Sequence, residues 1–314
     1  LKTTSMVAES SGSLLRGIVP PLLTPIRPDG SLDLEGLDRL VDHLVDGGVH
    51  GLFAMGSSGQ VAYLTDAERD LVVRRVVDRV GGRVPVVTGL PDLTARRVAE
   101  CAARSTDLGV DGVVVTAPFY ALNNEVEVAE HFRMIARATP LPVIAYDVPV
   151  RVHSKLGTGL LVALGQEGAI RGVKDSSGDD VAFRRLVIAN QDAGRPLELL
   201  TGHEVMVDGM LLLGADGAVP GLANVDPAGY SRLWNAAQRG DWEAARKEQD
   251  RLTRLFEIAF VPRGRSGDAG GIGAFKAALA LQGVIESGAM PAPLQSLTPE
   301  EIDGIRAVLD SVRA

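Results

Sequence analysis

The sequence predicts an α/β fold, a (β/α)8 TIM barrel followed by a C-terminal helical extension. Short runs rich in Val, Ile and Leu alternate with helical patterns as far as about Asn235, which is typical of repeated βαβ units. Eight such runs occur, and a chain of 314 residues is long enough to enclose a barrel core. No G-x-G-x-x-G motif follows a strand, which weakens the alternative of a doubly wound open sheet.

The eight predicted strands leave room for a helix between successive pairs. They span Gly17 to Pro25, Gly51 to Gly56, Val84 to Leu90, Gly112 to Pro118, Pro142 to Pro149, Ile170 to Ser176, Leu197 to Gly202 and Gly217 to Leu222. Several helical patterns between them begin with Asp or Thr, whose side-chain oxygens cap free N–H groups of a first turn. They include Asp33 to Val45, Asp66 to Val80, Thr94 to Leu108, Val126 to Ala138 and Asp179 to Asn190.

Beyond the eighth unit the pattern is helical only. Gly/Pro-rich stretches separate three further predicted helices, which span Asp241 to Phe260, Gly273 to Gln282 and Pro299 to Val312. We expect residues 17–237 to form the barrel, and residues 238–314 to pack as an extension on the barrel or on a neighbouring subunit. The small and polar residues at the start predict that residues 1–16 are a leader or a cloning remnant outside the fold.

Composition and charge exclude two kinds of partner. With 46% apolar and 23% charged residues the chain is ordinary for a globular protein, and no apolar stretch approaches the roughly 20 residues of a membrane helix. The net charge of -8 is spread along the chain, Lys and Arg form no block, and aromatic residues that stack on bases are few. We therefore expect neither a membrane span nor a nucleic-acid partner, but small-molecule substrates.

Cysteine and histidine usage favours a cytoplasmic protein without a metal. Cys101 is alone and forms no internal disulfide, and the opening segment lacks the pattern of a secretory signal. It lies in a helical pattern beside alanines, so we expect it to fill the core rather than act as a nucleophile. The histidines show no H-x-H or H-E-x-x-H ligand spacing; they are His43, His50, His131, His153 and His203.

Candidate functional residues lie where strands end. In a (β/α)8 barrel the βα loops at the carboxyl ends of the strands converge, so residues there are candidates for chemistry and residues at the opposite face for stability. Four features of the sequence fall at this face, namely Gly56-Ser57-Ser58-Gly59-Gln60, Tyr120, Tyr146 and Lys174.

Lys174 ends an apolar strand, within Gly172-Val173-Lys174-Asp175. Burial disfavours the charged form of a lysine and leaves a free amine that attacks a carbonyl to form a Schiff base. The alternative is a lysine that snorkels to solvent or pairs with Asp175. Lys155 and Lys276 share the residue type, but neither ends a predicted strand.

Two further strand ends carry polar groups. The glycines and serines of Gly56-Ser57-Ser58-Gly59 predict a tight turn whose N–H and hydroxyl groups hold a carboxylate or phosphate, although such turns also occur without a ligand. Tyr146 would point its phenol into the barrel mouth and transfer protons, or else pack in the core. Arg151 offers a bidentate clamp for a carboxylate, or is a solvated loop charge.

These motifs together resemble the pyruvate-dependent Schiff-base aldolases and lyases that include dihydrodipicolinate synthase and N-acetylneuraminate lyase. Gly56-Ser57-Ser58-Gly59-Gln60 is similar to the G-[TS]-[TS]-G-E of this family, Tyr146-Asp147-Val148-Pro149 to its Y-N-x-P, and Gly172-Val173-Lys174-Asp175 to its G-[IV]-K-[DE]. The intervals of 26 residues from Tyr120 to Tyr146 and 28 from Tyr146 to Lys174 are those expected of the family. The match extends over nearly the whole chain from Gly17.

The resemblance implies a covalent mechanism. Lys174 would attack C2 of pyruvate and lose water to give an iminium, whose enamine tautomer attacks an aldehyde. Tyr146 would move protons to and from the intermediates. Ser57 and Tyr120 would complete a hydroxyl relay, with Tyr120 reaching across a subunit contact. No cofactor is implied besides the imine.

The resemblance also implies how pyruvate and neighbouring subunits are held. Ser57 and Ser58, with the backbone of Gly56 and Gly59, would bind the pyruvate carboxylate, and Val219 would line the site with its carbonyl. Members of the family are usually tetramers of tight dimers, so a homo-oligomer is expected.

The second substrate is less clearly indicated. Arg151 matches the arginine with which dihydrodipicolinate synthases bind the carboxylate of aspartate semialdehyde, which favours that reaction and a role in lysine biosynthesis. Several residues depart from the synthase pattern, namely Gln60 for Glu, Asp147 for Asn and Val152-His153 for Thr-Gly. The run Lys174 to Asp179 is more similar to 2-keto-3-deoxy sugar-acid or 4-hydroxy-2-oxoglutarate aldolases. A non-catalytic keto-acid sensor is the alternative outside enzymes, and Phe119 before Tyr120 predicts no lysine feedback.

Overall fold

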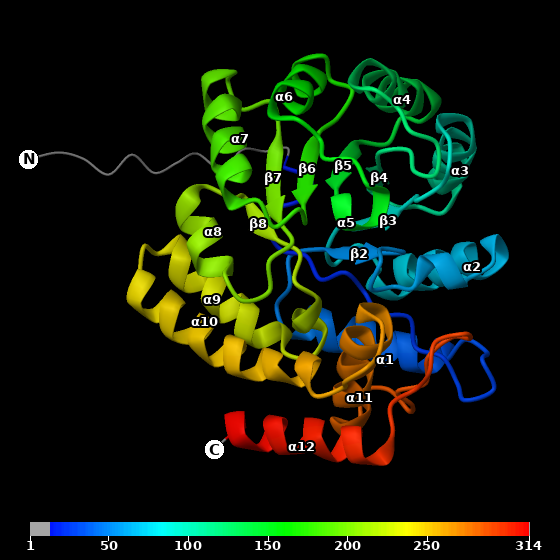
Figure 1. Cartoon of the computed structure of the whole chain (residues 1–314), viewed down its shortest axis with the longest axis vertical. Helices are drawn as coiled ribbons and strands as arrows, with labels where there is room; N and C mark the ends of the chain where they lie inside the picture. The colour runs from blue at the N-terminus through cyan, green and yellow to red at the C-terminus, as the bar shows by residue number, and fades with distance from the viewer. Residues whose placement is uncertain (1–12, 314) are drawn as a thin grey trace, which may run out of the picture.

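The computed structural model describes residues 13–313 and confirms the predicted (β/α)8 barrel with C-terminal helices (Figure 1). Eight parallel strands form one sheet in the order β1-β8-β7-β6-β5-β4-β3-β2. They are β1 (Gly17–Ile18), β2 (Leu52–Ala54), β3 (Val86–Gly89), β4 (Gly112–Thr116), β5 (Val143–Asp147), β6 (Gly172–Asp175), β7 (Glu198–Thr201) and β8 (Gly217–Ala218).

The barrel closes between its first two strands. Pro21 bridges Phe53 in parallel, the Leu22 N–H donates to the Phe53 carbonyl at 2.8 Å, and the Phe53 N–H donates to the Pro20 carbonyl at 3.0 Å. The observed β1 is much shorter than the predicted first strand, Gly17 to Pro25. Its prolines lack the N–H that a continuous ladder requires, so only two residues are paired as a strand.

Helices cover the outside of the barrel and follow the strands in the expected alternation. They are α1 (Leu34–Asp46), α2 (Asp66–Val80), α3 (Ala95–Asp107), α4 (Glu125–Ala138), α6 (Thr158–Gln166), α7 (Asp180–Asp192), α8 (Val207–Leu213) and α9 (Pro227–Gln238). Three of the predicted capping residues are present, with Asp33 at α1, Thr94 at α3 and Asp179 at α7. At α2 and α4 the caps precede the predicted starts: Thr65 and Glu68 form a reciprocal capping box at α2, and Asn124 and Glu127 form another at α4. Short helices interrupt the βα loops at η1 (Val61–Tyr63), α5 (Pro149–Val152) and η2 (Gly221–Asn224).

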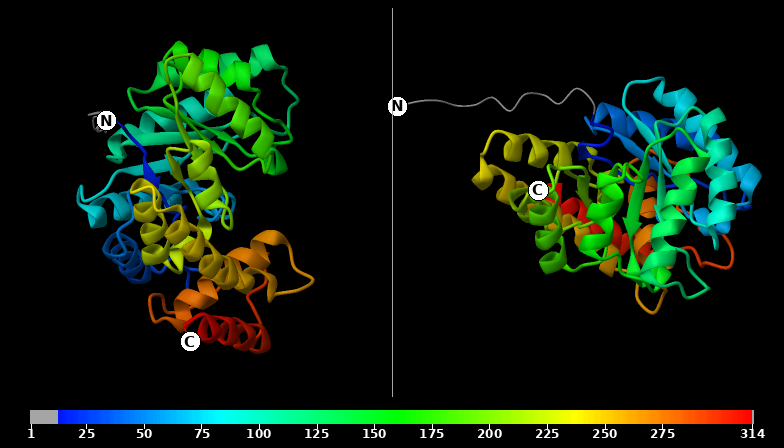
Figure 2. Two further views of the ribbon diagram at one scale, coloured as in Figure 1. Left: turned by 90° about the vertical axis from the view of Figure 1, so that its left-hand side faces the viewer. Right: turned by 90° about the horizontal axis from the view of Figure 1, so that it is seen from above.

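The C-terminal extension gathers on one side of the barrel (Figures 1 and 2), where Arg39 of α1 donates to the carbonyl of Val284 at 2.9 Å. It consists of α10 (Trp242–Phe256), η3 (Glu257–Phe260), the π-helix η4 (Asp268–Ile272), α11 (Gly273–Leu281) and α12 (Pro299–Arg313). Leu252 of α10, Phe275 of α11 and Ile305 of α12 belong to the same buried apolar cluster as Leu40 of α1. The extension therefore shares a core with the barrel and completes it on this side.

The start of the described chain is tied to the bottom of the barrel. The backbone N–H groups of Leu14 and Leu15 donate to the Glu198 carboxylate, each at 2.9 Å, and Leu15 is buried. Of the predicted leader, residues 1–12 lie outside the described residues.

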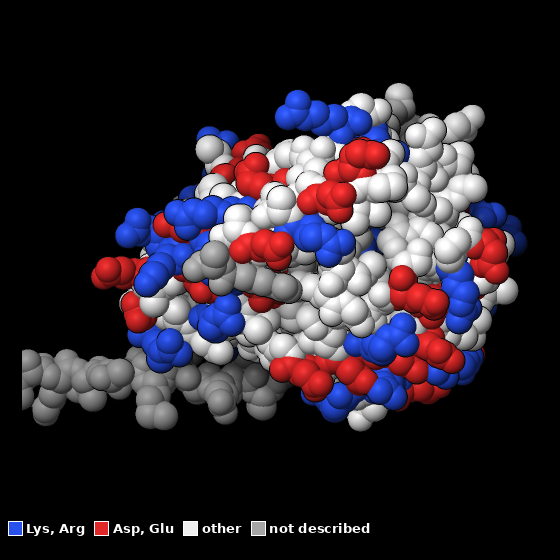
Figure 3. Space-filling view, turned by 90° about the horizontal axis from the view of Figure 1, so that it is seen from below, with Lys and Arg blue, Asp and Glu red and all other residues white. Residues whose placement is uncertain are grey.

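The surface is consistent with the dispersed charge of the sequence. On the face shown in Figure 3, acidic and basic side chains are interspersed. Within residues 13–313, no helix combines the length and the apolar character that crossing a membrane requires.

Candidate active site

Strand register places three polar side chains in one row inside the barrel. Thr116 of β4 is paired with Tyr146 of β5, and Tyr146 is paired with Lys174 of β6. Because successive side chains of a strand alternate between faces, residues paired at one level share a face, and their neighbours Asp147 and Asp175 point the other way. The three side chains therefore project from the carboxyl ends of adjacent strands, where the sequence predicts the site.

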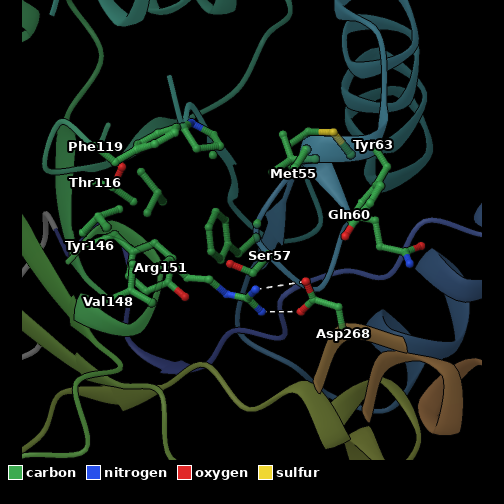
Figure 4. Close-up of a pocket in the computed structure, with 18 residues that line it drawn as sticks. Met55, Ser57, Gln60, Tyr63, Thr116, Phe119, Tyr146, Val148, Arg151 and Asp268 are labelled. Carbon is green, nitrogen blue, oxygen red and sulfur yellow. Dashed lines mark hydrogen bonds and ion pairs between the residues drawn. The ribbon is translucent and has the colours of Figure 1, made fainter. Parts of the chain in front are cut away.

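A cavity of about 200 Å³ opens at this end of the barrel (Figure 4). Four of the predicted site residues line it: Gly56, Ser57, Tyr146 and Arg151. Residues not singled out from the sequence line it too, among them Phe53, Thr116 and Asp268. The structure therefore brings together residues from β2, β4, β5 and the extension.

Lys174 does not itself line this cavity but lies against two aromatic residues that do, Tyr146 and Phe53. Its side chain is only 6% exposed, and Nζ lies 4.1 Å from the ring centroid of Tyr146 and 4.8 Å from that of Phe53. The alternatives considered from the sequence do not describe this side chain, because it does not reach solvent and Asp175 belongs to the opposite face of β6. An amine enclosed by two aromatic rings is shielded from water yet within reach of a small molecule bound in the cavity.

Tyr146 is held between the amine and two hydroxyls. Burial raises the pKa of its phenol, but Lys174 and hydrogen bonds with Ser176, Ser57 and Lys174 together bring that pKa below its ordinary value. A phenol with a lowered pKa, in contact with both an amine and a serine, is suited to accept and return protons.

The turn after β2 is shaped by close backbone approach. Met55 has a positive φ of 54°, and a Cβ on Gly89 of β3 would collide with the Met55 carbonyl, so glycine is required beneath the turn. Thr24 Oγ1 donates to the Gly59 carbonyl at 2.8 Å and fixes the end of the turn. Ser57 faces the cavity, whereas Ser58 and Gly59 lie beside it without lining it.

Behind the site, Lys155 joins the two carboxylates that point away from the cavity. Its Nζ bonds to Asp147 and lies 3.5 Å from Asp175 Oδ2, and both aspartates are buried. Burial raises the pKa of Asp147, and the hydrogen bonds from Lys155 and the Leu156 N–H oppose this shift only in part. Asp147 stands where the Y-N-x-P motif of the family has Asn. A lysine that pairs with its carboxylate accompanies this difference.

Glu204, after β7, organises the neighbouring strand end. Its carboxylate accepts the N–H of Gly221 at 2.6 Å and of Leu222 at 3.0 Å, which holds η2 directly after Val219. Burial raises the pKa of Glu204 to about 7, although these N–H groups and Lys174 act in the opposite direction. Val219 itself is buried, and its N–H donates to the Thr201 carbonyl at 2.8 Å.

Arg151 is already engaged by a carboxylate of the same chain. It lies in α5, and its Nη1 donates to Asp268 Oδ2 at 2.9 Å while Nη2 donates to Oδ1 (Figure 4). Asp268 belongs to η4 of the extension, and no local sequence signal relates it to Arg151.

Tyr120 is the one predicted catalytic residue that lies away from the cavity. Its side chain is 93% exposed, it has a positive φ of 74°, and the nearby Leu122 is also exposed. Within one described chain it does not contact Tyr146 or Ser57.

The fold and the cavity define a class of protein, the (β/α)8 barrels with a buried lysine and a phenol at the carboxyl ends of adjacent strands. The model of the dihydrodipicolinate synthetase family matches residues 14–312. The chain belongs to this family, and is a lyase of the family's barrel type.

Relatives and solved structures of the family are similar over almost the whole chain. An uncharacterized DapA-like lyase of Halobacterium salinarum is 36% identical over 94% of this chain and 93% of its own. A 4-hydroxy-tetrahydrodipicolinate synthase of Phenylobacterium zucineum is 34% identical over 79% and 83%. The dihydrodipicolinate synthase of Bacteroides thetaiotaomicron superposes with a TM-score of 0.88 at 31% identity, over 95% and 98% of the chains. YagE, a prophage protein of E. coli K12 solved in complex with pyruvate, superposes with a TM-score of 0.89 at 28% identity, over 96% and 99%.

Proposed function

We propose that the protein is a Schiff-base-forming lyase that uses pyruvate as its keto-acid substrate and Lys174 as its nucleophile. The observation that carries the proposal is the position of Lys174 Nζ, buried 4.1 Å from the ring centroid of Tyr146, a residue that lines the cavity. The amine adds to C2 of pyruvate, and the carbinolamine loses water to give an iminium. Loss of a proton from C3 gives an enamine, which forms the new C–C bond with an aldehyde carbon, and water then releases the product and the amine.

Tyr146 and Ser57 supply the proton transfers in this scheme. The phenol of Tyr146 gives a proton to the departing hydroxyl and to the oxygen of the incoming aldehyde, and its lowered pKa assists each donation. Ser57, with Ser58 and the backbone of Gly56 and Gly59, holds the pyruvate carboxylate. The solved complex of YagE with pyruvate supports pyruvate as the ligand of such a barrel. No cofactor enters, because the imine itself is the electron sink.

Tyr120 is proposed to act in a neighbouring subunit. Its exposure, and that of Leu122, suits a residue that is covered by a second copy of the chain and projects toward that copy's site. We accordingly propose a cytoplasmic homo-oligomer, a tetramer of tight dimers, in which the serine, the two tyrosines and the lysine complete each centre.

Two aldehyde partners remain as candidates for the second substrate. Aspartate semialdehyde, and with it a role in lysine biosynthesis, is supported by Arg151 at the cavity wall and by relatives named 4-hydroxy-tetrahydrodipicolinate synthase. Cleavage of a 2-keto-3-deoxy acid or of 4-hydroxy-2-oxoglutarate is the second candidate. The ion pair between Arg151 and Asp268 favours the neutral aldehyde that a 2-keto-3-deoxy acid would release, because Arg151 already binds a carboxylate.

Reductive trapping tests the proposed nucleophile. Pyruvate with borohydride should add a stable mass to a peptide that contains Lys174, and Lys174→Ala should abolish the adduct. Lys247→Ala, which removes an exposed lysine of α10, is the matched control and should leave trapping unchanged. An unmodified Lys174 refutes the lyase mechanism, whereas a trapped adduct without turnover of any aldehyde or keto acid would favour the keto-acid sensor.

A further inference from the structure

The guanidinium of Arg151 is occupied in the way that a substrate carboxylate would occupy it. Both Nη atoms donate to the two carboxylate oxygens of Asp268, a bidentate geometry that is the preferred way for arginine to recognise a carboxylate. Both residues line the cavity, and Figure 4 shows the guanidinium directed across the cavity rim at Asp268. Asp268 therefore stands where the acid group of a carboxylate-bearing aldehyde would be bound.

The segment that carries Asp268 is anchored to the extension. Three residues before it, Arg265 makes two bonds to Glu301 of α12, from Nε at 2.9 Å and from Nη2 at 2.7 Å, and both side chains are largely buried. Just after it, the Ala269 N–H donates to Ser266 Oγ at 3.2 Å and the Gly270 N–H donates to the Ser266 carbonyl at 2.8 Å. These contacts hold Asp268, the first residue of η4, in place beside Arg151.

The remaining wall of the cavity carries no formal charge. Among the described residues that line it, Arg151 and Asp268 alone have ionised side chains, and the others are apolar, aromatic, hydroxyl or amide groups. The pair makes the wall neutral overall, whereas Arg151 by itself would make it positive. The charge that an aldehyde meets at this rim is therefore set by Asp268.

We propose that Asp268 is a specificity-determining residue, which closes Arg151 to carboxylate-bearing aldehydes and directs the site to neutral ones, such as hydroxyaldehydes. This inference rests on the proposed Schiff-base function. A substrate carboxylate would have to displace Asp268 and leave two like charges beside one cation. A neutral aldehyde leaves the pair intact and accepts hydrogen bonds from the N–H groups of Arg151 that Asp268 does not use.

A matched pair of aldehydes tests the proposal. Succinic semialdehyde carries a carboxylate and 4-oxobutanamide replaces it by an isosteric amide, while glyceraldehyde represents the hydroxyaldehydes. For each, kcat/KM with pyruvate is measured for the wild-type protein and for Asp268→Asn, Asp268→Glu and Asp310→Asn. Asp310 is an exposed carboxylate of α12 and serves as the control for charge alone.

The wild-type protein should prefer the amide over the carboxylate by about tenfold or more, a ratio typical of one displaced charge-assisted contact. Asp268→Asn should shift that ratio toward the carboxylate by about tenfold, Asp268→Glu should largely keep the wild-type preference, and Asp310→Asn should change nothing. Trapping of the pyruvate imine should be equal in all four proteins.

A wild-type preference for succinic semialdehyde over 4-oxobutanamide overturns the proposal. So does the absence of reaction with any neutral aldehyde in a protein that forms the trapped pyruvate imine. An unchanged ratio in a folded Asp268→Asn protein does the same, and the wild-type comparison stands even if that variant fails to fold. Failure of pyruvate trapping in the wild-type protein would instead refute the proposed function on which the inference rests.

Discussion

The Nζ atom of Lys276 lies 2.6 Å from Oε1 of Gln60, and its other acceptor is the Ala289 carbonyl at 3.2 Å. Lys276 is fully buried in α11, whereas Gln60 is part of the turn after β2 and lines the cavity. Both acceptors are neutral, so no carboxylate that bonds to Lys276 compensates the positive charge of its ammonium group. Burial accordingly lowers the pKa of Lys276 from 10.5 to about 7.

This buried amine makes stability depend on pH. The folded-state pKa of about 7 lies below the unfolded-state value of 10.5, so between these pH values the unfolded chain binds the extra proton. The free energy of unfolding should therefore rise with pH above 7, by up to about 1.4 kcal/mol per pH unit from this group. Urea unfolding between pH 6 and 9 measures the slope.

A carboxylate at position 60 should remove that dependence. Gln60→Glu places a negative charge beside Lys276, raises the lysine pKa in the folded protein and flattens the slope above pH 7 relative to wild type. Lys276→Met, which deletes the titrating group, should flatten it as well. Equal slopes in wild type and both variants would show that Lys276 stays protonated throughout.

Removing the hydroxyl of Tyr146 should separate its role in proton transfer from its role in packing. Tyr146→Phe keeps the ring that contacts Lys174 and Phe53 but loses the hydroxyl that moves protons. We expect kcat to fall by about 10² to 10⁴, with slower formation of the trapped pyruvate imine and little change in the urea midpoint. Tyr63→Phe, at the same cavity wall, is the matched control, and a similar loss there would argue against a special role for Tyr146.

Truncating Arg151 should affect the aldehyde and spare pyruvate. Arg151→Ala leaves Asp268 unpaired at the cavity rim, so a carboxylate-bearing aldehyde meets a negative wall. We expect its kcat/KM to fall by about tenfold or more, while imine trapping with pyruvate is unchanged. The double variant with Asp268→Asn should recover part of the loss, and unchanged aldehyde kinetics would remove Arg151 from aldehyde binding altogether.

Lys155 should be required for stability rather than for chemistry. Lys155→Met leaves the carboxylates of Asp147 and Asp175 adjacent and without their shared cation. We expect a loss of about 1–3 kcal/mol in the free energy of unfolding, moderated because Lys155 reaches the surface. Adding Asp147→Asn should restore part of it by removing one of the two charges. A wild-type urea midpoint for Lys155→Met would contradict this account.

Complementation between subunits tests the placement of Tyr120. Lys174→Ala and Tyr120→Phe proteins should each have greatly reduced activity when assayed alone. If Tyr120 serves a neighbouring subunit, mixed oligomers contain a site with an intact lysine and a partner's intact tyrosine, and part of the activity returns after dissociation and reassociation. Sedimentation establishes the oligomer, and a mixture that regains nothing would place Tyr120 outside the site.

Much of the barrel, and the place of Tyr146 and Lys174 in it, could be predicted from local sequence patterns. The alternation of apolar strands and capped helices predicts the βα units, because burial imposes periods of 2 and 3.6 on the sequence. Strand ends then place Tyr146 and Lys174 at one face, and the paired register confirms that they are neighbours. The predicted length of β1 was wrong, because a run of apolar residues does not show where prolines, which lack an N–H, end the hydrogen-bond ladder between strands.

The partners of the charged groups depended on packing between distant segments. Arg151 and Asp268 are 117 residues apart, and Gln60 and Lys276 are 216 apart. No local period relates such pairs, since they meet only because the C-terminal extension docks beside α1 and carries η4 to the cavity rim. Sequence patterning thus assigns the barrel and the row of chemical groups, whereas tertiary docking sets the charge around them, because electrostatic partners are chosen by distance in space and not by distance along the chain.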